Sequence, residues 1–272
     1  MRVWVLGSGS RGNAVLVDSA GTRVLIDAGF GPRTLAARLK LAGVDARSVA
    51  ACVVTHDHSD HVRGAAKAAL RWGWQLFATA GTAAAPDLAR VHVTTFAHGD
   101  TVRVGSFEVH AVATPHDAAE PVGVVITALA SGARAAICYD IGHGSDGVRT
   151  LCQSVDVLVL EANHDEGMLW AGPYPPWLCK RIASNTGHLS NRAAGEVARD
   201  VVSPQLAHLV LAHLSEKNNT PTLADRTIRS ALRATSFRGK LTTTQQDAVT
   251  GPFTPRGFTS RPEPAVQLAF AL

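Results

Sequence analysis

Short apolar runs bounded by glycine or polar residues dominate the first part of the chain. Runs of aliphatic and β-branched residues with such boundaries are typical of buried strands. We therefore expect strands over residues 3–6, 14–18, 23–27 and 50–55. Between the last two, apolar residues recur at helical spacing behind a proline, so residues 32–41 are expected to form a helix.

The remainder of the chain alternates between the same two patterns. Further strands are expected over residues 107–113, 122–129, 134–139, 156–160 and 206–211. Further helices are expected over residues 62–72, 175–183, 191–202 and 222–234. The segment 250–264, rich in Pro, Gly and Thr, predicts an irregular excursion before a final strand over 265–270. No repeat, charge block or low-complexity linker interrupts the sequence, so we expect a single domain over residues 1–272, with two sheets and outer helices.

The composition is that of an ordinary globular protein, with 46% hydrophobic and 18% charged residues among 272, which excludes a disordered chain. The formal net charge of +4 permits an acidic partner such as nucleic acid without requiring one. The 4 cysteines form no C-x-x-C pair, which favours reduced thiols in a cytoplasmic protein. The apolar N-terminal run is too short for a signal peptide, and no run of about 18 apolar residues predicts a membrane span.

Histidine is the unusual residue of this composition, with 12 copies against 8 of Phe and 2 of Tyr. Residues 55–61, Thr-His-Asp-His-Ser-Asp-His, follow a predicted strand and precede a helical pattern. Alternate residues of an extended segment point the same way, so His56 and His58 can bind one ion. As the chain enters a helix, Asp60 and His61 can turn toward a second position. Imidazole and carboxylate ligands at a strand end favour zinc or another divalent metal over a solvated polar loop.

Three more candidate ligands follow other predicted strands: His116, Asp140 and His213. A lone histidine is more often an ordinary core or surface residue, but the repeated order of strand and then ligand predicts a cluster along one edge of the fold. Two metal ions about 3.5–4 Å apart need about this number of ligands, with one carboxylate shared between them.

The H-x-H-x-D-H segment at 56–61, with these three residues, resembles the metallo-β-lactamase fold of metal-dependent hydrolases. The resemblance implies an α/β fold, a four-layer αββα sandwich with a dinuclear site at one edge. It implies that the first metal is held by His56, His58 and His116. It implies that the second is held by Asp60, His61 and His213, with Asp140 bridging the two ions. Asp27 matches the family's structural aspartate beside the site.

Five further segments resemble one branch of this superfamily, the YycJ/WalJ branch, which is similar to tRNase Z. They are residues 7–13 (GSGSRGN), 114–123, 160–165 (LEANHD), 187–191 (GHLSN) and 212–219 (AHLSEKNN). The branch is associated with nuclease activity, so the resemblance implies a phosphodiesterase, including 5′-to-3′ exonuclease action on double-stranded DNA. The match extends from about residue 3 to the helix expected over 222–234, and the tail 250–272 is not distinctive.

The catalytic roles expected of this chain follow from that chemistry. Two divalent cations lower the pKa of a shared water and neutralise charge on the phosphodiester. Asp60 is expected to orient the resulting hydroxide or take its proton. His188 is expected to protonate the leaving alkoxide, and Glu161 to hold its imidazole, as in the tRNase Z resemblance. Each residue also has an alternative role without catalysis. His188 would be a residue at the start of a helix with its hydrogen bonds made locally, and Glu161 would be the partner in a salt bridge.

Substrate contacts are expected from polar residues near these motifs: Ser8, Arg11, Asn13, His164, Ser190, Asn191 and Asn218. The loop 7–13 either offers backbone N–H groups and a cation to a phosphate or is a tight turn between two strands. The polar residues after His188 and His213 would position a nucleic-acid strand without reading its bases.

A small-molecule hydrolase of the same fold, such as a thioester hydrolase or a lactonase, is the main alternative, because its metal ligands are nearly identical. The Gly-His-Leu-Ser segment and the positive charge favour the nuclease. A flavodiiron-type redox protein typically has Glu in place of one His of the H-x-H, whereas this chain keeps His58. The sequence leaves open whether the metals are zinc, manganese or iron, and whether the substrate is DNA or RNA.

Overall fold

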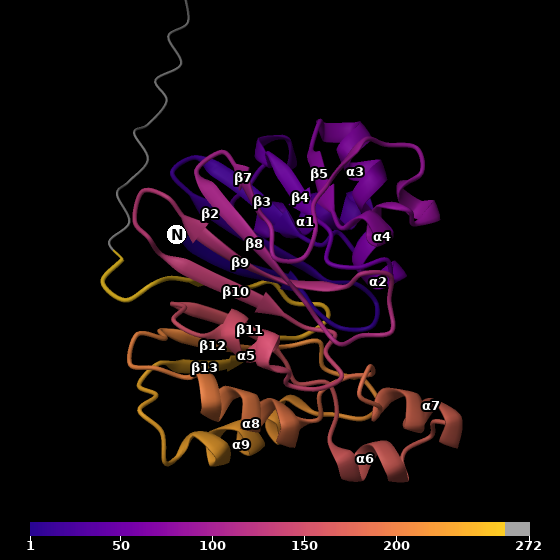
Figure 1. Cartoon of the computed structure of the whole chain (residues 1–272), viewed down its shortest axis with the longest axis vertical. Helices are drawn as coiled ribbons and strands as arrows, with labels where there is room; N and C mark the ends of the chain where they lie inside the picture. The colour runs from indigo at the N-terminus through magenta and orange to yellow at the C-terminus, as the bar shows by residue number, and fades with distance from the viewer. Residues whose placement is uncertain (259–272) are drawn as a thin grey trace, which may run out of the picture.

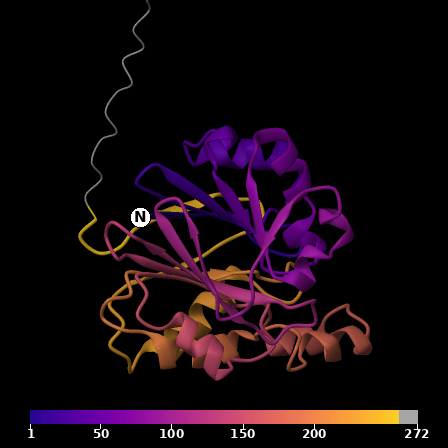
Figure 2. The same cartoon turned by 45° about the horizontal axis from the view of Figure 1, so that its top comes forward.

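Two seven-stranded sheets lie face to face in the computed structural model, which describes residues 1–258, and helices cover the outer side of each sheet (Figure 1). The view in Figure 2 shows the same order of layers from another side. The predicted αββα sandwich is therefore confirmed.

The first sheet has the strand order β14-β1-β2-β3-β4-β5-β6. Its strands are β1 (Arg2–Gly7), β2 (Ala14–Ser19), β3 (Thr22–Ile26), β4 (Ala51–Val53), β5 (Gln75–Ala78), β6 (Val93–Thr95) and β14 (Thr250–Phe253). The pairs from β3 to β6 are parallel, and the pairs from β14 to β3 are antiparallel.

The second sheet has the strand order β13-β12-β11-β10-β9-β8-β7. Its strands are β7 (Thr101–Val104), β8 (Phe107–Ala113), β9 (Val122–Ala128), β10 (Arg134–Cys138), β11 (Val157–Glu161), β12 (His208–Ala212) and β13 (Lys240–Thr243). The pairs from β10 to β13 are parallel, so these strands have their carboxyl ends at one edge of the sheet. That edge is where ligands are expected to gather.

Helices α1 (Pro32–Leu41) and α3 (Ala65–Trp72) cover the first sheet, and α5 (Asp146–Cys152), α8 (Asn191–Val201) and α9 (Pro221–Leu232) cover the second (Figure 1). The short elements are α2 (Ser59–Val62), α4 (Ala80–Ala83), α6 (Glu166–Ala171), α7 (Pro176–Ile182) and the 3₁₀ turns η1 (Ala46–Ser48) and η2 (Pro86–Leu88). Of the helices in the described range, none combines the length and apolarity needed to cross a bilayer.

Alternation along the strands produces three apolar layers, because successive side chains of a strand point to opposite faces. Val5 of β1 and Phe107 of β8 are fully buried between the two sheets. Leu16 of β2 points the other way and is buried with Leu35 and Leu39 of α1. The site residues therefore stand on a framework that is packed on both faces of both sheets.

Most predicted elements are confirmed within one or two residues, but two expectations need correction. The helix expected over 62–72 is two helices, α2 and α3, because Gly64 lies against the carbonyl groups of Ala28 and Phe30. The excursion expected over 250–264 contains strand β14, which pairs with β1. Strand β14 contains Pro252. Proline has no backbone N–H to donate, and an edge strand tolerates it because one side of such a strand has no partner. The strand expected over 265–270 lies outside the described residues.

Candidate metal centre

The predicted ligands lie where strands of both sheets end. Asp27 follows β3, His56 to His61 follow β4, and the second sheet contributes residues after β8, β10 and β12: His116, Asp140 and His213. Three of these residues have left-handed backbone conformations, with φ of +62° at Asp27, +56° at Asp140 and +55° at His213. Such conformations are costly for residues other than glycine and cluster at functional sites.

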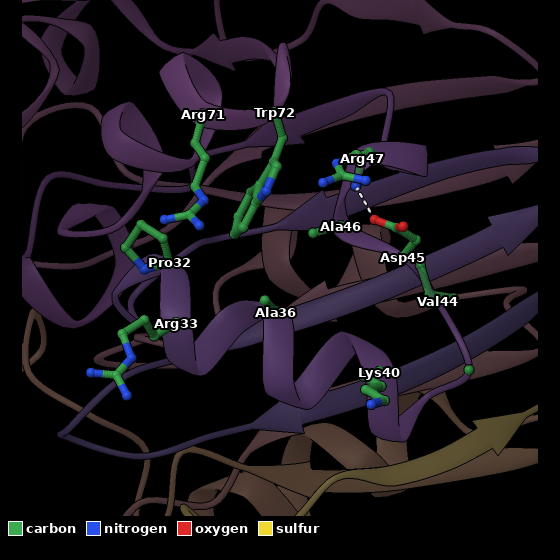
Figure 3. Close-up of a pocket in the computed structure, with 11 residues that line it drawn as sticks. Pro32, Arg33, Ala36, Lys40, Val44, Asp45, Ala46, Arg47, Arg71 and Trp72 are labelled. Carbon is green, nitrogen blue, oxygen red and sulfur yellow. Dashed lines mark hydrogen bonds between the residues drawn. The ribbon is translucent and has the colours of Figure 1, made fainter.

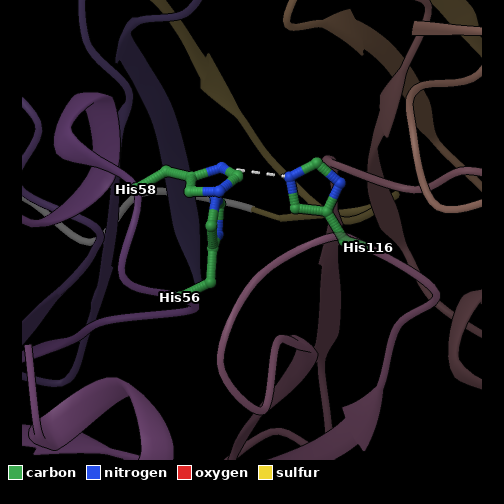
Figure 4. Close-up of side chains that lie close together, drawn as sticks. All are labelled: His56, His58 and His116. Atoms are coloured by element: carbon green, nitrogen blue, oxygen red, sulfur yellow. Dashed lines mark hydrogen bonds between the residues drawn. The ribbon is translucent and has the colours of Figure 1, made fainter. Parts of the chain in front are cut away.

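Three histidine rings face one another at this edge (Figure 4). His58 Nδ1 lies 3.2 Å from His116 Nε2, and the other nitrogen of His116, Nδ1, lies 3.0 Å from the carbonyl oxygen of Gly187. His56 Nε2 is buried and has no hydrogen-bond partner among the described residues. Two nitrogens about 2.1 Å from one tetrahedral zinc ion lie about 3.4 Å apart, so the His58–His116 spacing fits a shared cation.

A second group of ligand atoms lies beside the first. Asp60 Oδ2 is 3.3 Å from His61 Nε2 and 3.4 Å from His213 Nε2. Asp140 stands between the groups, with Oδ2 3.0 Å from His61 Nε2 and Oδ1 3.8 Å from His116 Nε2. Asp140 Oδ2 is buried and has no hydrogen-bond partner in the described part of the chain. The donor set of imidazoles and carboxylates, with unpartnered buried atoms, fits divalent metal ions.

Asp27 is fully buried and contacts His61 of the second group. Its carboxylate accepts hydrogen bonds from Thr55 N–H at 2.7 Å and from the Tyr139 hydroxyl at 2.7 Å. The same carboxylate lies 2.7 Å from His61 Nδ1. This contact leaves His61 Nε2 directed toward Asp60 and Asp140, as a metal ligand requires.

Glu161 and His188 form a pair next to these ligands. Glu161 is fully buried, and its Oε1 lies 2.7 Å from His188 Nδ1 and 3.2 Å from His213 Nδ1. Glu161 Oε2 accepts hydrogen bonds from the backbone N–H groups of Ile141 and Leu189. His188 has an 18% exposed side chain, so its ring is held on one side and open to the pocket on the other.

The electrostatics of the centre favour a cation. Burial would raise the pKa of Glu161, but the charge of His188 and the hydrogen bonds from His188 and His213 outweigh it and lower the pKa to about 2. Burial would lower the pKa of His213, but Asp140 and the hydrogen bonds with Asp60 and Glu161 raise it to about 10. Burial, with the positive charge of His61, holds the pKa of His56 well below its usual value. A neutral His56 and ionised carboxylates are the states that bind metal, whereas His213 would have to release its proton to a cation.

The ligands open into a cavity of about 220 Å³. One wall consists of the metal ligands with His188, and the opposite wall comes from the α6–α7 segment: Tyr174, Leu178, Arg181 and Ile182. Arg181 Nε is 2.6 Å from Asp117 Oδ2, which ties this wall to the residue after His116. The sequence analysis predicted the helix of this wall, over 175–183, but not its place beside the candidate ligands, because that place depends on how the chain between β11 and α8 folds back.

A larger groove of about 720 Å³ lies between α1 and α3 and contains none of the predicted metal ligands (Figure 3). Its lining includes Arg33, Lys40, Arg47 and Arg71 around Trp72, with Asp45 as its acidic residue. Cavity size therefore does not locate the chemistry in this fold, whereas the convergence of ligand atoms does.

The residues expected to contact substrate mostly serve the protein itself. Ser8 donates a hydrogen bond to Asn13 Oδ1 and accepts one from the His213 N–H, each at 2.8 Å. Asn13 Nδ2 lies 3.0 Å from His61 Nε2. Both side chains are buried beside candidate ligands, while Ser10 of the same loop lines the cavity. Arg11 is exposed, and its guanidinium is paired with Glu216 and Asp247.

The other expected substrate contacts lie in the second half of the chain. Ser190 caps α8 and donates to Glu166, and Asn191 donates to Asn219. His164 and Asn218 are buried, and each has side-chain atoms without a hydrogen-bond partner in the described residues. None of these four residues is among the described residues that line the cavity.

Comparison with known proteins agrees with this geometry. Residues 22–214 match the model of the beta-lactamase superfamily domain. The chain belongs to this superfamily. Within it, the chain is 32% identical over 238 residues to the exodeoxyribonuclease YycJ of Bacillus anthracis, covering 86% of this chain and 89% of that protein. It is 29% identical over 237 residues to the exodeoxyribonuclease WalJ of Streptococcus pneumoniae, covering 84% and 87%.

The fold of this superfamily member also matches solved structures. The metallo-beta-lactamase fold protein YhfI of Bacillus subtilis aligns with a TM-score of 0.68 at 17% sequence identity, over 92% of this chain and 98% of that one. The superfamily and its YycJ/WalJ relatives, expected from the motifs, are thereby confirmed, and the chain is a metallo-β-lactamase-fold hydrolase with His/Asp clusters suited to divalent metal.

Proposed function

We propose that this protein is a dinuclear metal-dependent nuclease that degrades double-stranded DNA from the 5′ end. The observation that carries the proposal is the Glu161–His188 pair, 2.7 Å apart beside the ligand groups. This pair adds a positioned proton donor to a set of metal ligands that other hydrolases of the fold also have. The relatives named exodeoxyribonuclease support the same chemistry.

Two metal positions are assigned to the ligand groups. The first metal is held by His56, His58 and His116. The second is held by Asp60, His61 and His213, with Asp140 bridging. Zinc fits these ligands, and manganese or iron are alternatives of the same site. When bound, such cations activate a water and offset the charge that develops on a phosphodiester.

The chain's own residues then supply orientation and proton transfer. Asp60 is 20% exposed toward the pocket and accepts a hydrogen bond from the attacking water, which fixes the direction of attack. His188 Nδ1 is engaged with Glu161, so Nε2 is the atom that meets the leaving oxygen and gives it a proton. Glu161 acts through His188 and is a positioning residue.

The cellular compartment, the partner and the domain organisation of the protein are part of the same proposal. All four cysteines are buried free thiols, which supports a reducing compartment such as the cytoplasm. Nucleic acid is the proposed partner, in keeping with the net charge of +4. We assign the activity to one domain over residues 1–272.

A digestion assay with the metal-reconstituted protein tests this function. It compares end-labelled double-stranded DNA, single-stranded DNA, RNA and a thioester. We expect mononucleotides to be released from the 5′ end of the duplex. Hydrolysis of the thioester alone would instead establish the small-molecule hydrolase of the same fold.

Two variants separate the roles of the residues. Asp60→Ala is expected to abolish turnover and to lower the metal content, because it removes a ligand and the group that orients water. His188→Ala is expected to lower kcat about 10²–10⁴-fold with an unchanged metal content. Unchanged turnover in His188→Ala would exclude its role as proton donor.

A further inference from the structure

Two large aromatic side chains are exposed on the segment that forms one wall of the metal pocket. Trp170 of α6 is 58% exposed, and Trp177 of α7 is 67% exposed. Figure 1 shows these two helices together at one corner of the molecule, beyond the layer of α8 and α9. Tryptophans left open to solvent in this way are enriched at binding surfaces, since their apolar rings gain from being covered.

Trp177 is adjacent in the chain to a residue that lines the metal pocket, although it is not itself among the lining residues. Leu178 and Arg181, which line the pocket, follow it on the same short helix. Residues four apart on a helix have Cβ atoms about 5–6 Å apart on one face, so Trp177 is the neighbour of Arg181 on the outer side. No residue of α6 lines the pocket within the described chain, which makes Trp170 the more distant of the two rings.

The helix that presents Trp177 is fixed relative to the metal ligands. Pro175 and Pro176 precede Trp177 and limit the backbone at the start of α7. The Cys179 thiol donates to the carbonyl oxygen of Leu169, at 3.3 Å, which joins α7 to α6. The Arg181–Asp117 ion pair joins α7 to the residue after His116. The backbone that carries the indole is therefore held in one place, and a ligand has mainly the rotation of the Trp177 side chain left to order.

We propose that Trp177 stacks on an unpaired nucleobase of the strand whose phosphodiester lies at the metal centre. The proposal rests on the proposed nuclease function and specifies its substrate as a strand end that is unpaired next to the scissile phosphate. Every nucleobase has a π-face, so such stacking tolerates any sequence. The sequence of α7, Pro-Trp-Leu-Cys-Lys-Arg-Ile, has two basic residues and no acidic one, which complements the charge of the phosphate backbone.

Steady-state kinetics with a DNA duplex whose 5′ end is left unpaired tests the stacking contact. Trp177→Ala is expected to raise KM about 5- to 100-fold, the range for losing one base–aromatic stack, with kcat and metal content unchanged. Trp177→Phe is expected to keep most of the affinity, because a smaller ring still stacks. Trp170→Ala is the matched control and is expected to keep the wild-type KM. A wild-type KM in Trp177→Ala, or the same loss in Trp170→Ala, overturns the assignment.

An abasic substrate identifies the partner of the ring. Removing the base next to the scissile phosphate is expected to raise the KM of the wild-type protein by the same factor as Trp177→Ala. The base removal and the variant together are expected to cost little more than either alone, because both remove one contact. Effects that multiply would show that Trp177 contacts another part of the substrate and would overturn the proposal.

A binding measurement separates this inference from the nuclease function. An oligonucleotide with 2-aminopurine at its unpaired end is titrated with metal-free protein in EDTA, where no cleavage occurs. The fluorescence is expected to be quenched by the wild-type and Trp177→Phe proteins and not by Trp177→Ala. If the metal-reconstituted wild-type protein cleaves nucleic acid but the quenching survives in Trp177→Ala, only the stacking assignment fails. If it cleaves no nucleic acid, the proposed function itself fails.

Discussion

Asp27 is the residue on which the orientation of the second ligand group depends. Its carboxylate accepts from the Thr55 N–H and hydroxyl and from the Tyr139 hydroxyl, and it lies 2.7 Å from His61 Nδ1. With these partners in place, the carboxylate acts as an acceptor at every contact, so a proton resides on His61 Nδ1. The lone pair on Nε2 is then available to a cation, as histidine ligands require.

Asp27→Asn is expected to weaken metal binding about 10- to 100-fold. An amide in this position turns an N–H group toward donors and no longer fixes the tautomer of His61. Competition with a chromophoric chelator measures the affinity. Asp18→Asn is the control, because Asp18 is equally buried but pairs with Arg2 away from the metal centre. Equal metal affinity of Asp27→Asn and the wild-type protein would contradict this role for Asp27.

At the scale of elements, the turn that carries Asp60 is seated directly on backbone. The Asn13 N–H donates to the Asp60 carbonyl at 2.8 Å, and the Gly29 N–H donates to the Asn13 carbonyl at 3.0 Å. A Cβ atom on Gly29 would lie 1.7 Å from the Asp60 carbonyl oxygen. Only glycine leaves room for this approach, so the loop after β3 determines where α2 begins.

Gly29→Ala is therefore expected to displace the Asp60 turn. We expect the free energy of unfolding to fall by about 1–3 kcal/mol, as overpacking typically costs, and the metal affinity to fall with it. Urea denaturation and metal titration measure the two effects. Gly31→Ala offers a matched control two residues away, where an added Cβ meets nothing within 4 Å. Similar losses in both variants would show that the close approach to Asp60 is not the cause.

The elements that the sequence predicted best have strong local signals. Helix α1 has the predicted bounds, with a proline in its first turn and apolar residues at helical spacing. Strands β5, β6, β7 and β13 were not predicted, because each has only three or four residues and, unlike the equally short β4, none lies within an apolar run like that of residues 50–54. Strand β14 has the same weakness, and its partner β1 lies at the other end of the chain. Short strands are defined by their neighbours in the sheet more than by their own residues.

The distinction between local sequence signals and tertiary contacts also applies to the site. The convergence of the candidate metal ligands could be predicted, because each follows a strand and parallel strands bring their carboxyl ends to one edge. The supporting place of Asn13 and the contact of Tyr139 with Asp27 could not, since they depend on tertiary packing. The sequence around Trp177 predicted a helix but no role for the side chain, because the proposed role depends on where the α6–α7 segment packs in the fold.

At the scale of the whole molecule, the metal centre joins the two sheets. His56, His58, Asp60 and His61 belong to the first half of the sandwich, and His116, Asp140 and His213 to the second. In the structure, His61 of the first half lies 3.0 Å from Asp140 of the second, and Asp60 of the first half lies 3.4 Å from His213 of the second. Ions bound there connect residues far apart in sequence, and they bind the folded chain far better than the unfolded one.

Metal binding should therefore stabilise the entire fold and not only the site. At a free metal concentration of 100 times Kd, linkage adds about 2.7 kcal/mol, which corresponds to a rise in Tm of about 5–10 °C for a chain of this size. Thermal unfolding with zinc and with EDTA measures the shift. His116→Ala is expected to lose most of it although every ligand of the first sheet remains, whereas His92→Ala, an exposed histidine outside the site, is expected to keep it. A full shift in His116→Ala would mean that an ion at the first ligand group, with His56, His58 and His116, does not contribute to the stability of the fold.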